Sequence, residues 1–509
     1  MKQRYLAALL TGFALFLLSP FLFGEEPVSQ RGETSTTEAI LPVEIGDPLL
    51  EQASAIGDLV AEIRGLPLLE PIPKGIKSRD QLRAMLLERF EEEVPDEEFR
   101  AIELVYKRLG LMPEDLDYRQ LMIDLLTEQI AGFYDQDAKE LYIMEGLPEA
   151  IQGPTMAHEI FHAIQDQHFD IGAMLEAFSS DENGDFALAR MALIEGDAFV
   201  LMFDYQLWEM GIFPSGTNRS VADNPAISAM ILQLDPESMT AVEQLSPSDA
   251  PSLGTSEVPS LTDSVLGNAP PIVRDVLLFP YVGGMNFVLR ARAGRTWESF
   301  NEIYGNAPAS TSHILHPERY FEGDSPLELR FDPHPAIPDY ERIYQNVLGE
   351  LQTRSWLTTL FKGSDRMPAI NDIAAQWDGD RLMGFEGPNE EVIVVHVSTW
   401  RSTEGAQHFA RTLQEATGKR HEAEGVHSRG ENGESWCFRL GEDQSGERVL
   451  IERWGELVLY IEGAPSKLDE AGRETLGTTF LLRDAVWDSL LRVPFQEVLE
   501  KRKRELANP

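Results

Sequence analysis

Residues 155–169 have the sequence TMAHEIFHAIQDQHF, which contains the pattern His-Glu-x-x-His. The apolar residues of this stretch recur at helical spacing, which predicts an amphipathic helix. His158 and His162 are then one turn apart on the same face, where both imidazoles can bind one metal ion. Glu159 lies beside the first histidine and can accept a proton from a metal-bound water. The alternative is an ordinary helix in which both histidines have structural roles.

A catalytic zinc ion usually has three protein ligands and a water molecule, so a third ligand is expected. Residues 185–211 predict a long helix with Glu195 in the middle of an otherwise apolar face. Burying a carboxylate is costly unless it is paired or bound to a metal ion, which favours Glu195 as the third ligand over a capping or salt-bridged glutamate. Gly196 allows a second helix to approach closely. Asp197 and Asp166 are candidates to hold a ligand imidazole by its free N–H.

The composition excludes several classes of protein. The chain has 509 residues, which is too long for one compact core and predicts two or three domains. It has 85 Asp and Glu residues against 43 Lys and Arg residues, a formal net charge of -42. Such a surface repels polyanions, so nucleic acid is not expected as a partner. Cys437 is the only cysteine, which rules out an intramolecular disulfide and a zinc site built on cysteines.

The N-terminus predicts export. Lys2 and Arg4 precede an apolar run at residues 6–23, and the sequence becomes acidic directly after Gly24. We interpret residues 1–24 as a cleaved signal peptide. The alternative is a run that remains as a single membrane anchor. Either interpretation places the rest of the protein outside the cytoplasm, in the periplasm, the cell envelope or the medium. No later segment is expected to be apolar enough to span a membrane.

The rest of the sequence predicts an α+β fold with two domains. A flexible linker is expected at residues 25–48. It precedes a mostly helical domain with a small sheet at residues 49–338, and a smaller α+β domain at residues 339–509. Residues 214–272 are polar and rich in Ser and Pro, and they predict a long surface excursion or a lid. Helices are expected early in the first domain, at residues 49–63, 78–93, 96–110 and 117–132.

A strand is expected at residues 139–144, just before the His-Glu-x-x-His helix. At the edge of a sheet, its unpaired N–H and C=O groups could receive an extended peptide; otherwise it only supports the helix. The C-terminal domain shows no catalytic constellation. It is predicted to contain strands at 392–397 and 435–440, a helix at 403–416, a hairpin at 449–462 and a final helix at 485–506.

Several segments together resemble a known family: EQIAGFYD at 128–135, HEIFHAIQDQHFD at 158–170 and ALIEGDA at 192–198. They are similar to bacterial and archaeal zinc peptidases of the gluzincin type, and further patterns extend the resemblance over about residues 117–322. The resemblance implies a zincin-like fold and the reaction class, but no particular substrate. It also implies that the Zn²⁺ ligands are His158, His162 and Glu195. The general base that it implies is Glu159.

Peptide hydrolysis needs a donor aimed at the developing oxyanion. In gluzincins, a His or Tyr beyond the third ligand commonly supplies it. The resemblance therefore makes His316 and Tyr320 catalytic candidates, with His313 and Tyr281 behind them. Structural roles are open for all four residues.

These observations predict an exported zinc metallopeptidase that hydrolyses peptide bonds in a peptide or protein substrate through a zinc-activated water. One alternative is a catalytically silent, zinc-containing binding or scaffold protein of the cell envelope. Glu159 argues against it, because a structural zinc site needs no general base. A hydrolase of a non-peptide amide is a further alternative, since it would use the same chemistry with a different pocket.

Overall fold

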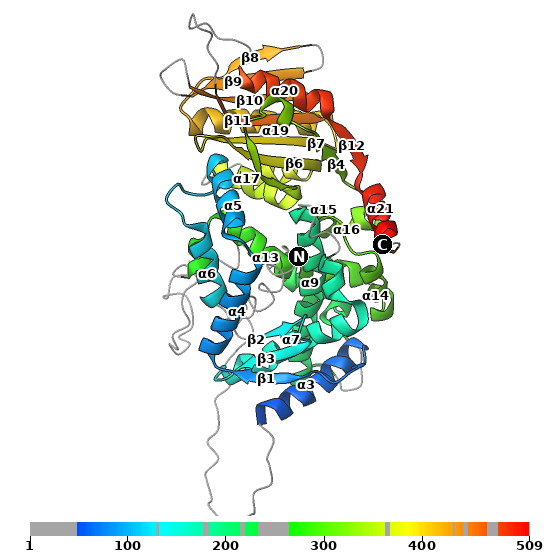
Figure 1. Cartoon of the computed structure of the whole chain (residues 1–509). Coiled ribbons are helices and arrows are strands. Elements are labelled where there is room, and N and C mark those ends of the chain that lie inside the picture. Colours follow the sequence, from blue (N-terminus) through cyan, green and yellow to red (C-terminus); the bar gives the residue numbers. More distant parts are fainter. Residues whose placement is uncertain are drawn as a thin grey trace, which may run out of the picture.

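The structure, a computed structural model, describes most of the chain after its N-terminal segment (Figure 1). The predicted signal peptide and residues 25–47 of the predicted linker lie outside the described residues, and so do residues 233–263 of the predicted excursion. The described residues are 48–128, 132–176, 183–213, 219–232, 264–361, 367–430, 433–440, 446–465 and 477–507.

The expected α+β fold is confirmed: a mostly helical N-terminal region with a small sheet precedes a region built on a larger sheet. Ser78 starts the second described helix with a capping box shared with Gln81. The third has acidic residues in its first turn and basic residues in its last, which suits the helix dipole. Four early helices form near the predicted positions: α3 (Pro48–Arg64), α4 (Arg79–Glu93), α5 (Asp96–Arg108) and α6 (Tyr118–Glu128). The predicted end of the fourth helix at residue 132 is wrong, because Gly132 begins a strand.

The small sheet has three strands in the order β1 (Lys74–Lys77), β3 (Glu140–Met144) and β2 (Gly132–Asp135). The strand expected at residues 139–144 is β3, but it is central and not at the edge. It pairs in parallel with β1 and antiparallel with β2, so its backbone groups are already used. The prediction of an edge strand there is therefore wrong. Local sequence missed β1 and β2 because both are only four residues long.

Three long helices form the centre of the helical region: α7 (Glu149–Phe169), α9 (Gly184–Glu209) and α13 (Pro271–Arg292). Helix α9 is buried around nearly its whole circumference, as expected for a helix that other elements surround. It crosses α13 at two glycines. A Cβ added at Gly196 would lie 2.1 Å from the backbone carbonyl carbon of Gly284. The close approach predicted from Gly196 is therefore confirmed.

Shorter elements surround these three helices in the helical region. The shorter elements are α8 (Ile171–Glu176), η1 (Val221–Asp223), α10 (Pro225–Ile231), α12 (Val265–Asn268), α14 (Trp297–Gly305), α15 (Thr311–Leu315) and α16 (Pro317–Glu322).

Helix α13 is long and apolar enough to cross a membrane by length and composition alone, and it is the only such helix in the part of the chain that the structure describes. The expectation that no segment after the N-terminal run is apolar enough to span a membrane is therefore wrong, because the composition of α13 meets that criterion. In the structure 72% of its most apolar window is buried. Its apolar residues pack against α9, which explains the composition.

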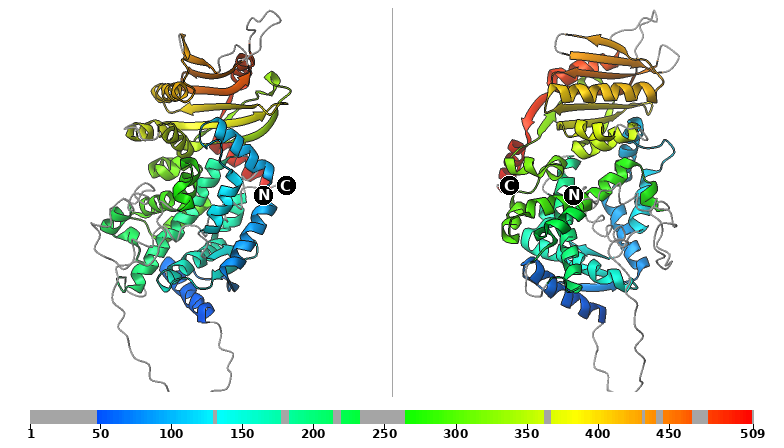
Figure 2. Two further views of the ribbon diagram at one scale, coloured as in Figure 1. Left: turned by 90° about the vertical axis from the view of Figure 1, so that its left-hand side faces the viewer. Right: turned by 180° about the vertical axis from the view of Figure 1, so that it is seen from behind.

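The C-terminal region is built on a seven-stranded sheet in which every neighbouring pair is antiparallel. Figure 2 shows this sheet stacked on one end of the helical region. Helix α5 contacts the sheet, and Arg100 of this helix forms an ion pair with Glu386. The sheet order is β5 (Glu341–Asn346), β6 (Trp377–Glu386), β7 (Val392–Trp400), β11 (Leu457–Pro465), β10 (Glu447–Trp454), β9 (Gly433–Arg439) and β8 (Val426–Arg429).

The prediction of a single helix at residues 485–506 is wrong. A short strand interrupts it and pairs with a strand before the large sheet, and Pro494 ends that strand. A proline in the interior of a helix removes a backbone hydrogen bond and clashes with the preceding turn, so one continuous helix across Pro494 is disfavoured. The remaining elements are β4 (Leu327–Arg330), η4 (His334–Ala336), α17 (Gly349–Leu360), α18 (Met367–Ala374), α19 (Thr403–Arg420), α20 (Thr478–Ser489), β12 (Leu491–Pro494) and α21 (Phe495–Ala507).

We expect Gly196→Ala to lower the free energy of unfolding by about 3 kcal/mol or more, because the new methyl group would meet backbone that cannot move away without separating α9 from α13. Gly305→Ala is the matched control. A Cβ there has nothing within 4 Å, and alanine favours a helix over glycine by about 1 kcal/mol. Urea denaturation of both variants measures the difference. Equal stability of the two would contradict the tight crossing.

Candidate metal centre

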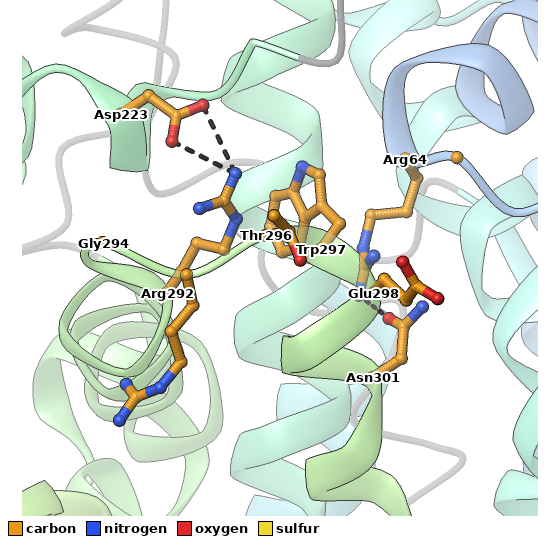
Figure 3. Close-up of a pocket in the computed structure, with 10 residues that line it drawn as sticks. Arg64, Asp223, Arg292, Gly294, Thr296, Trp297, Glu298 and Asn301 are labelled. Carbon is orange, nitrogen blue, oxygen red and sulfur yellow. Dashed lines mark hydrogen bonds and ion pairs between the residues drawn. The ribbon is translucent and has the colours of Figure 1, made fainter.

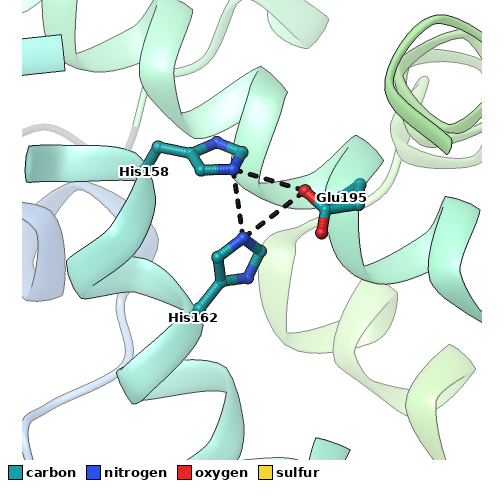
Figure 4. Close-up of side chains that lie close together, drawn as sticks. All are labelled: His158, His162 and Glu195. Atoms are coloured by element: carbon teal, nitrogen blue, oxygen red, sulfur yellow. Dashed lines mark hydrogen bonds and ion pairs between the residues drawn. The ribbon is translucent and has the colours of Figure 1, made fainter. Parts of the chain in front are cut away.

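Helices α7 and α9 bring three potential ligands together. The side-chain ligand atoms of His158, His162 and Glu195 all lie within 4.8 Å of one another (Figure 4). The two Nε2 atoms are 3.0 Å apart, and Glu195 Oε2 is 3.3 Å from His158 Nε2 and 3.4 Å from His162 Nε2. Ligands bound at 2.0–2.1 Å in a tetrahedron are separated by about 3.3–3.4 Å. The spacing of these atoms therefore fits one tetrahedral metal ion.

The carboxylate of Glu195 is buried without hydrogen bonds from the described residues. Neither carboxylate oxygen of Glu195 has a hydrogen-bond partner within the described structure, although the side chain is fully buried. Burying a carboxylate is costly, and a cation between Glu195 and the two imidazoles would offset that cost. Burial alone would raise the pKa of Glu195, but the adjacent His162 and His158 outweigh it and lower that pKa. The carboxylate is thus poised as an anionic ligand.

The two histidines differ in their electrostatic surroundings. Burial lowers the pKa of His158 and outweighs the attraction of Glu195. Burial also opposes the charged form of His162, but Glu195 and Glu159 together raise its pKa to about 9. Since a histidine binds a metal through a neutral ring nitrogen, a cation at the cluster would have to displace a proton from His162.

Glu159 lies beside the cluster and is positioned by the small sheet. Its Oε2 accepts a hydrogen bond from the backbone N–H of Tyr134, at 3.1 Å, while Oε1 has no partner in the described structure. Burial raises the pKa of Glu159 to about 8, against the opposing effect of His162. Tyr134 belongs to β2, so β2 supplies the hydrogen bond to Glu159, while both β2 and β3 pack against α7. Strand β2 has the sequence GFYD, and four residues are too few to show the alternation that predicts a strand.

Gln165 is the residue that sequence reasoning missed. Its Oε1 lies 2.8 Å from His162 Nδ1, and its Nε2 donates to the backbone oxygen of Ile194 and to the hydroxyl of Tyr304. Gln165 follows His162 by three residues, which places both on one face of α7. The three-residue spacing in the sequence could have indicated that Gln165 contacts His162.

The expected role of Asp197 as the partner of a ligand imidazole is wrong. Asp197 follows Glu195 by two residues, which turns its side chain by about 200° to the far side of α9. There it accepts two hydrogen bonds from Arg64 of α3, with Nη2 to Oδ2 at 2.9 Å and Nε to Oδ1 at 3.1 Å. Tyr304 also donates to it, at 2.8 Å.

Asp166 does not contact a ligand imidazole either. Its Oδ2 accepts from the hydroxyl of Tyr134, at 2.9 Å, and pairs with Lys139 in the turn between β2 and β3. One turn further along α7 than His162, it faces the small sheet. Asp166 therefore supports the hairpin that positions Glu159.

The predicted oxyanion donors make their polar contacts elsewhere. His316 Nε2 lies 2.7 Å from Glu350 of α17, and the Tyr320 hydroxyl donates to the backbone oxygen of Asn306. Their catalytic roles gain no support from these contacts. Tyr281 is connected more directly to the cluster: its ring is 5.5 Å from that of Phe199, which is 5.9 Å from the His158 ring.

The cluster is enclosed. His158, His162, Glu195 and Glu159 each expose at most 1% of their surface. A cavity of about 730 Å³ lies on the other side of Arg64, around Trp297 and Arg292, and none of the four lines it (Figure 3). The arrangement can hold a divalent cation beside a carboxyl group, in a setting from which bulk water is excluded.

We expect the protein to bind about one equivalent of Zn²⁺ and Glu195→Gln to lose it, because an amide is a poor substitute for a carboxylate ligand. Glu209→Gln, at the exposed end of the same helix, removes the same charge and should keep the metal. Metal content after dialysis, measured by mass spectrometry, distinguishes the two. A wild-type protein without metal, or equal metal in both variants, would refute the site.

Comparison with known proteins assigns only part of the chain. Residues 339–472 match a family described as a domain of unknown function, DUF8575. No curated protein and no solved structure matches the chain. The family match covers much of the C-terminal sheet and does not include the cluster of His158, His162 and Glu195.

Proposed function

We propose that the protein is a zinc-dependent hydrolase that cleaves peptide bonds, with zinc held by His158, His162 and Glu195. The observation that carries the proposal is the buried carboxyl group of Glu159 beside these ligands. One of its oxygens is held by the backbone N–H of Tyr134, and the other has no hydrogen-bond partner among the described residues, so it is free to accept a proton. A metal site that only stabilises a fold needs no such group.

The residues of the chain would divide the reaction between them. A bound zinc ion lowers the pKa of a water molecule and polarises a carbonyl group. Tyr134 holds Glu159 through its backbone N–H, which leaves Oε1 to accept the proton of the attacking water. The same oxygen then returns the proton to the leaving amine, so Glu159 ends the cycle in its starting state. His316 and Tyr320 stay predictions as oxyanion donors.

The sequence supports further parts of this proposal. The N-terminal segment supports export, with a single membrane anchor as the alternative to a cleaved signal peptide. The net charge of -42 argues against nucleic acid as a partner. A peptide or protein substrate is what the family resemblance implies. The gluzincin-type resemblance of the motif segments points to the same reaction class.

One observation favours a second candidate function. All four side chains of the site are almost completely buried, whereas a peptidase must admit a polypeptide to its metal. A catalytically silent protein that uses zinc to join α7 and α9 would need no access. Hydrolysis would require an opening of the enclosure, so the two candidates differ in measurable turnover.

We expect Glu159→Gln to reduce hydrolysis of an unstructured protein substrate by about 10²-fold to 10⁴-fold, because glutamine cannot accept the proton. Zinc content should stay at the wild-type level, since Glu159 is not a ligand. Glu145→Gln, an exposed change just before α7, is the matched control and should leave turnover unchanged. Equal turnover of the Glu159→Gln variant and the wild type would refute the proposed base. Zinc binding without any turnover would favour the silent protein.

A further inference from the structure

A continuous chain of buried hydrogen bonds runs from His162 to the N-terminal helix α3. It passes from His162 Nδ1 to Gln165 Oε1, from Gln165 Nε2 to the Tyr304 hydroxyl, and from that hydroxyl to Asp197 Oδ2; each distance is 2.8 Å. Arg64 completes the chain with its two hydrogen bonds to Asp197. The four helices involved are α7, α14, α9 and α3, so the chain joins segments from residue 64 to residue 304.

The chemistry of each group gives this chain a single direction. A carboxylate only accepts hydrogen bonds, so Asp197 requires the Tyr304 hydroxyl to donate. The hydroxyl oxygen is then free to accept from an amide N–H, which turns the nitrogen of Gln165 toward Tyr304 and its oxygen toward His162. A ring nitrogen facing an amide oxygen must carry a proton. His162 therefore donates from Nδ1, and the lone pair of its neutral form lies at Nε2, which faces the cluster.

Two further contacts support that direction. Gln165 Nε2 also donates to the backbone oxygen of Ile194, an acceptor that cannot become a donor. Burial, followed by the charge of Asp197, raises the pKa of Tyr304 well above its ordinary value, so its hydroxyl keeps its proton. An inverted amide at Gln165 would place oxygen against oxygen at Ile194 and lose both hydrogen bonds.

Arg64 supplies the charge that a buried Asp197 requires. Both side chains of this pair have 0% exposure. Nη2 of the guanidinium also donates to Asn301 Oδ1, at 2.8 Å, and the guanidinium carbon lies 3.9 Å from the ring centre of Trp297. Figure 3 shows Arg64 held between these residues at the wall of the cavity. Because Arg64 is the last residue of α3, the pair exists only when α3 is docked.

We propose that Gln165 is a positioning residue for the metal centre, and that Tyr304, Asp197 and Arg64 set its orientation. The relay keeps the Nε2 lone pair of His162 directed at the metal, so that docking of α3 raises metal affinity. The inference rests on the metal centre of the proposed function but does not depend on hydrolysis. A purely structural ion pair would instead stabilise the fold and leave metal affinity unchanged.

The test compares two variants that each remove one buried or half-buried tyrosine hydroxyl. Tyr304→Phe breaks the relay between Gln165 and Asp197. Tyr205→Phe is the matched control, because its hydroxyl bonds Glu209 on α9 and lies outside the relay. We expect Tyr304→Phe to lower Zn²⁺ affinity by about 10-fold to 100-fold, the usual effect of losing support for a ligand histidine. Tyr205→Phe should match the wild type. Competition with a chelating dye measures affinity, on proteins with native circular dichroism.

A second measurement separates the relay from a general loss of stability. Gln165→Leu should lower affinity to a similar extent, and adding Tyr304→Phe to it should cause no further loss, because both changes interrupt one chain. In the zinc-loaded protein, the imidazole N–H proton signal of His162 should shift in Tyr304→Phe and stay unchanged in Tyr205→Phe. Wild-type affinity in Tyr304→Phe, or additive losses in the double variant, would overturn the proposal. A wild type that binds zinc but hydrolyses nothing would leave it intact and refute only the proposed reaction.

Discussion

Helix α9 is enclosed by other elements on all sides, yet it carries four buried carboxyl groups, and much of the structure follows from that constraint. A charge inside a protein must be paired, neutralised or bound to a cation. The four groups meet this requirement in different ways. Asp197 is paired with Arg64, and the pair ties α3 to the core. Asp185 and Asp204 lie in settings where burial raises the pKa, to about 7 and about 8, and each accepts backbone hydrogen bonds. Among the described residues, the two imidazoles of α7 are the ion-pair partners of Glu195.

The crossing of α9 with α13 makes this enclosure possible. With no side chains at Gly196 and Gly284, the two backbones come into contact, and α13 covers the side of α9 next to Glu195. A Cβ at either glycine would overlap the backbone of the facing helix, so the crossing requires glycine at both positions. The backbone contact and the electrostatic cluster therefore depend on each other: tight packing creates the low-dielectric site, and the low dielectric strengthens the pairing of Glu195 with its histidines.

The burial of the cluster affects both the chemistry that it can support and the access of a substrate to it. A site shielded from water strengthens the electrostatic effect of a metal ion and of a nearby carboxyl group on a reaction. It also restricts the size of what can reach them. The small sheet holds Glu159 at one side of the cluster, and the relay through Gln165 holds His162 at the other. Tyr134 comes from the small sheet, and the groups that fix Gln165 come from α9 and α14, which gives the site a rigidity that α7 alone would not provide.

The sequence by itself located the long helices and the three residues that gather in the candidate metal cluster. The period of apolar residues located the long helices, the spacing of His158 and His162 placed them on one face, and an isolated glutamate in an apolar helix identified Glu195. These inferences depend on contacts within one helix or on the cost of burying a charge, and both are local properties.

Only the tertiary structure decided which residues support the ligands. Asp197 looked like the partner of an imidazole, but the rotation of the helix directs it to Arg64, which lies 133 residues away in the sequence. Gln165 has an ordinary polar side chain, and nothing local shows that Ile194 and Tyr304 fix its amide. The order of the small sheet likewise depends on β1, which pairs with a strand more than sixty residues later. Such long-range pairing is set by the packing of the whole chain, because short segments carry too little pattern to specify their partners.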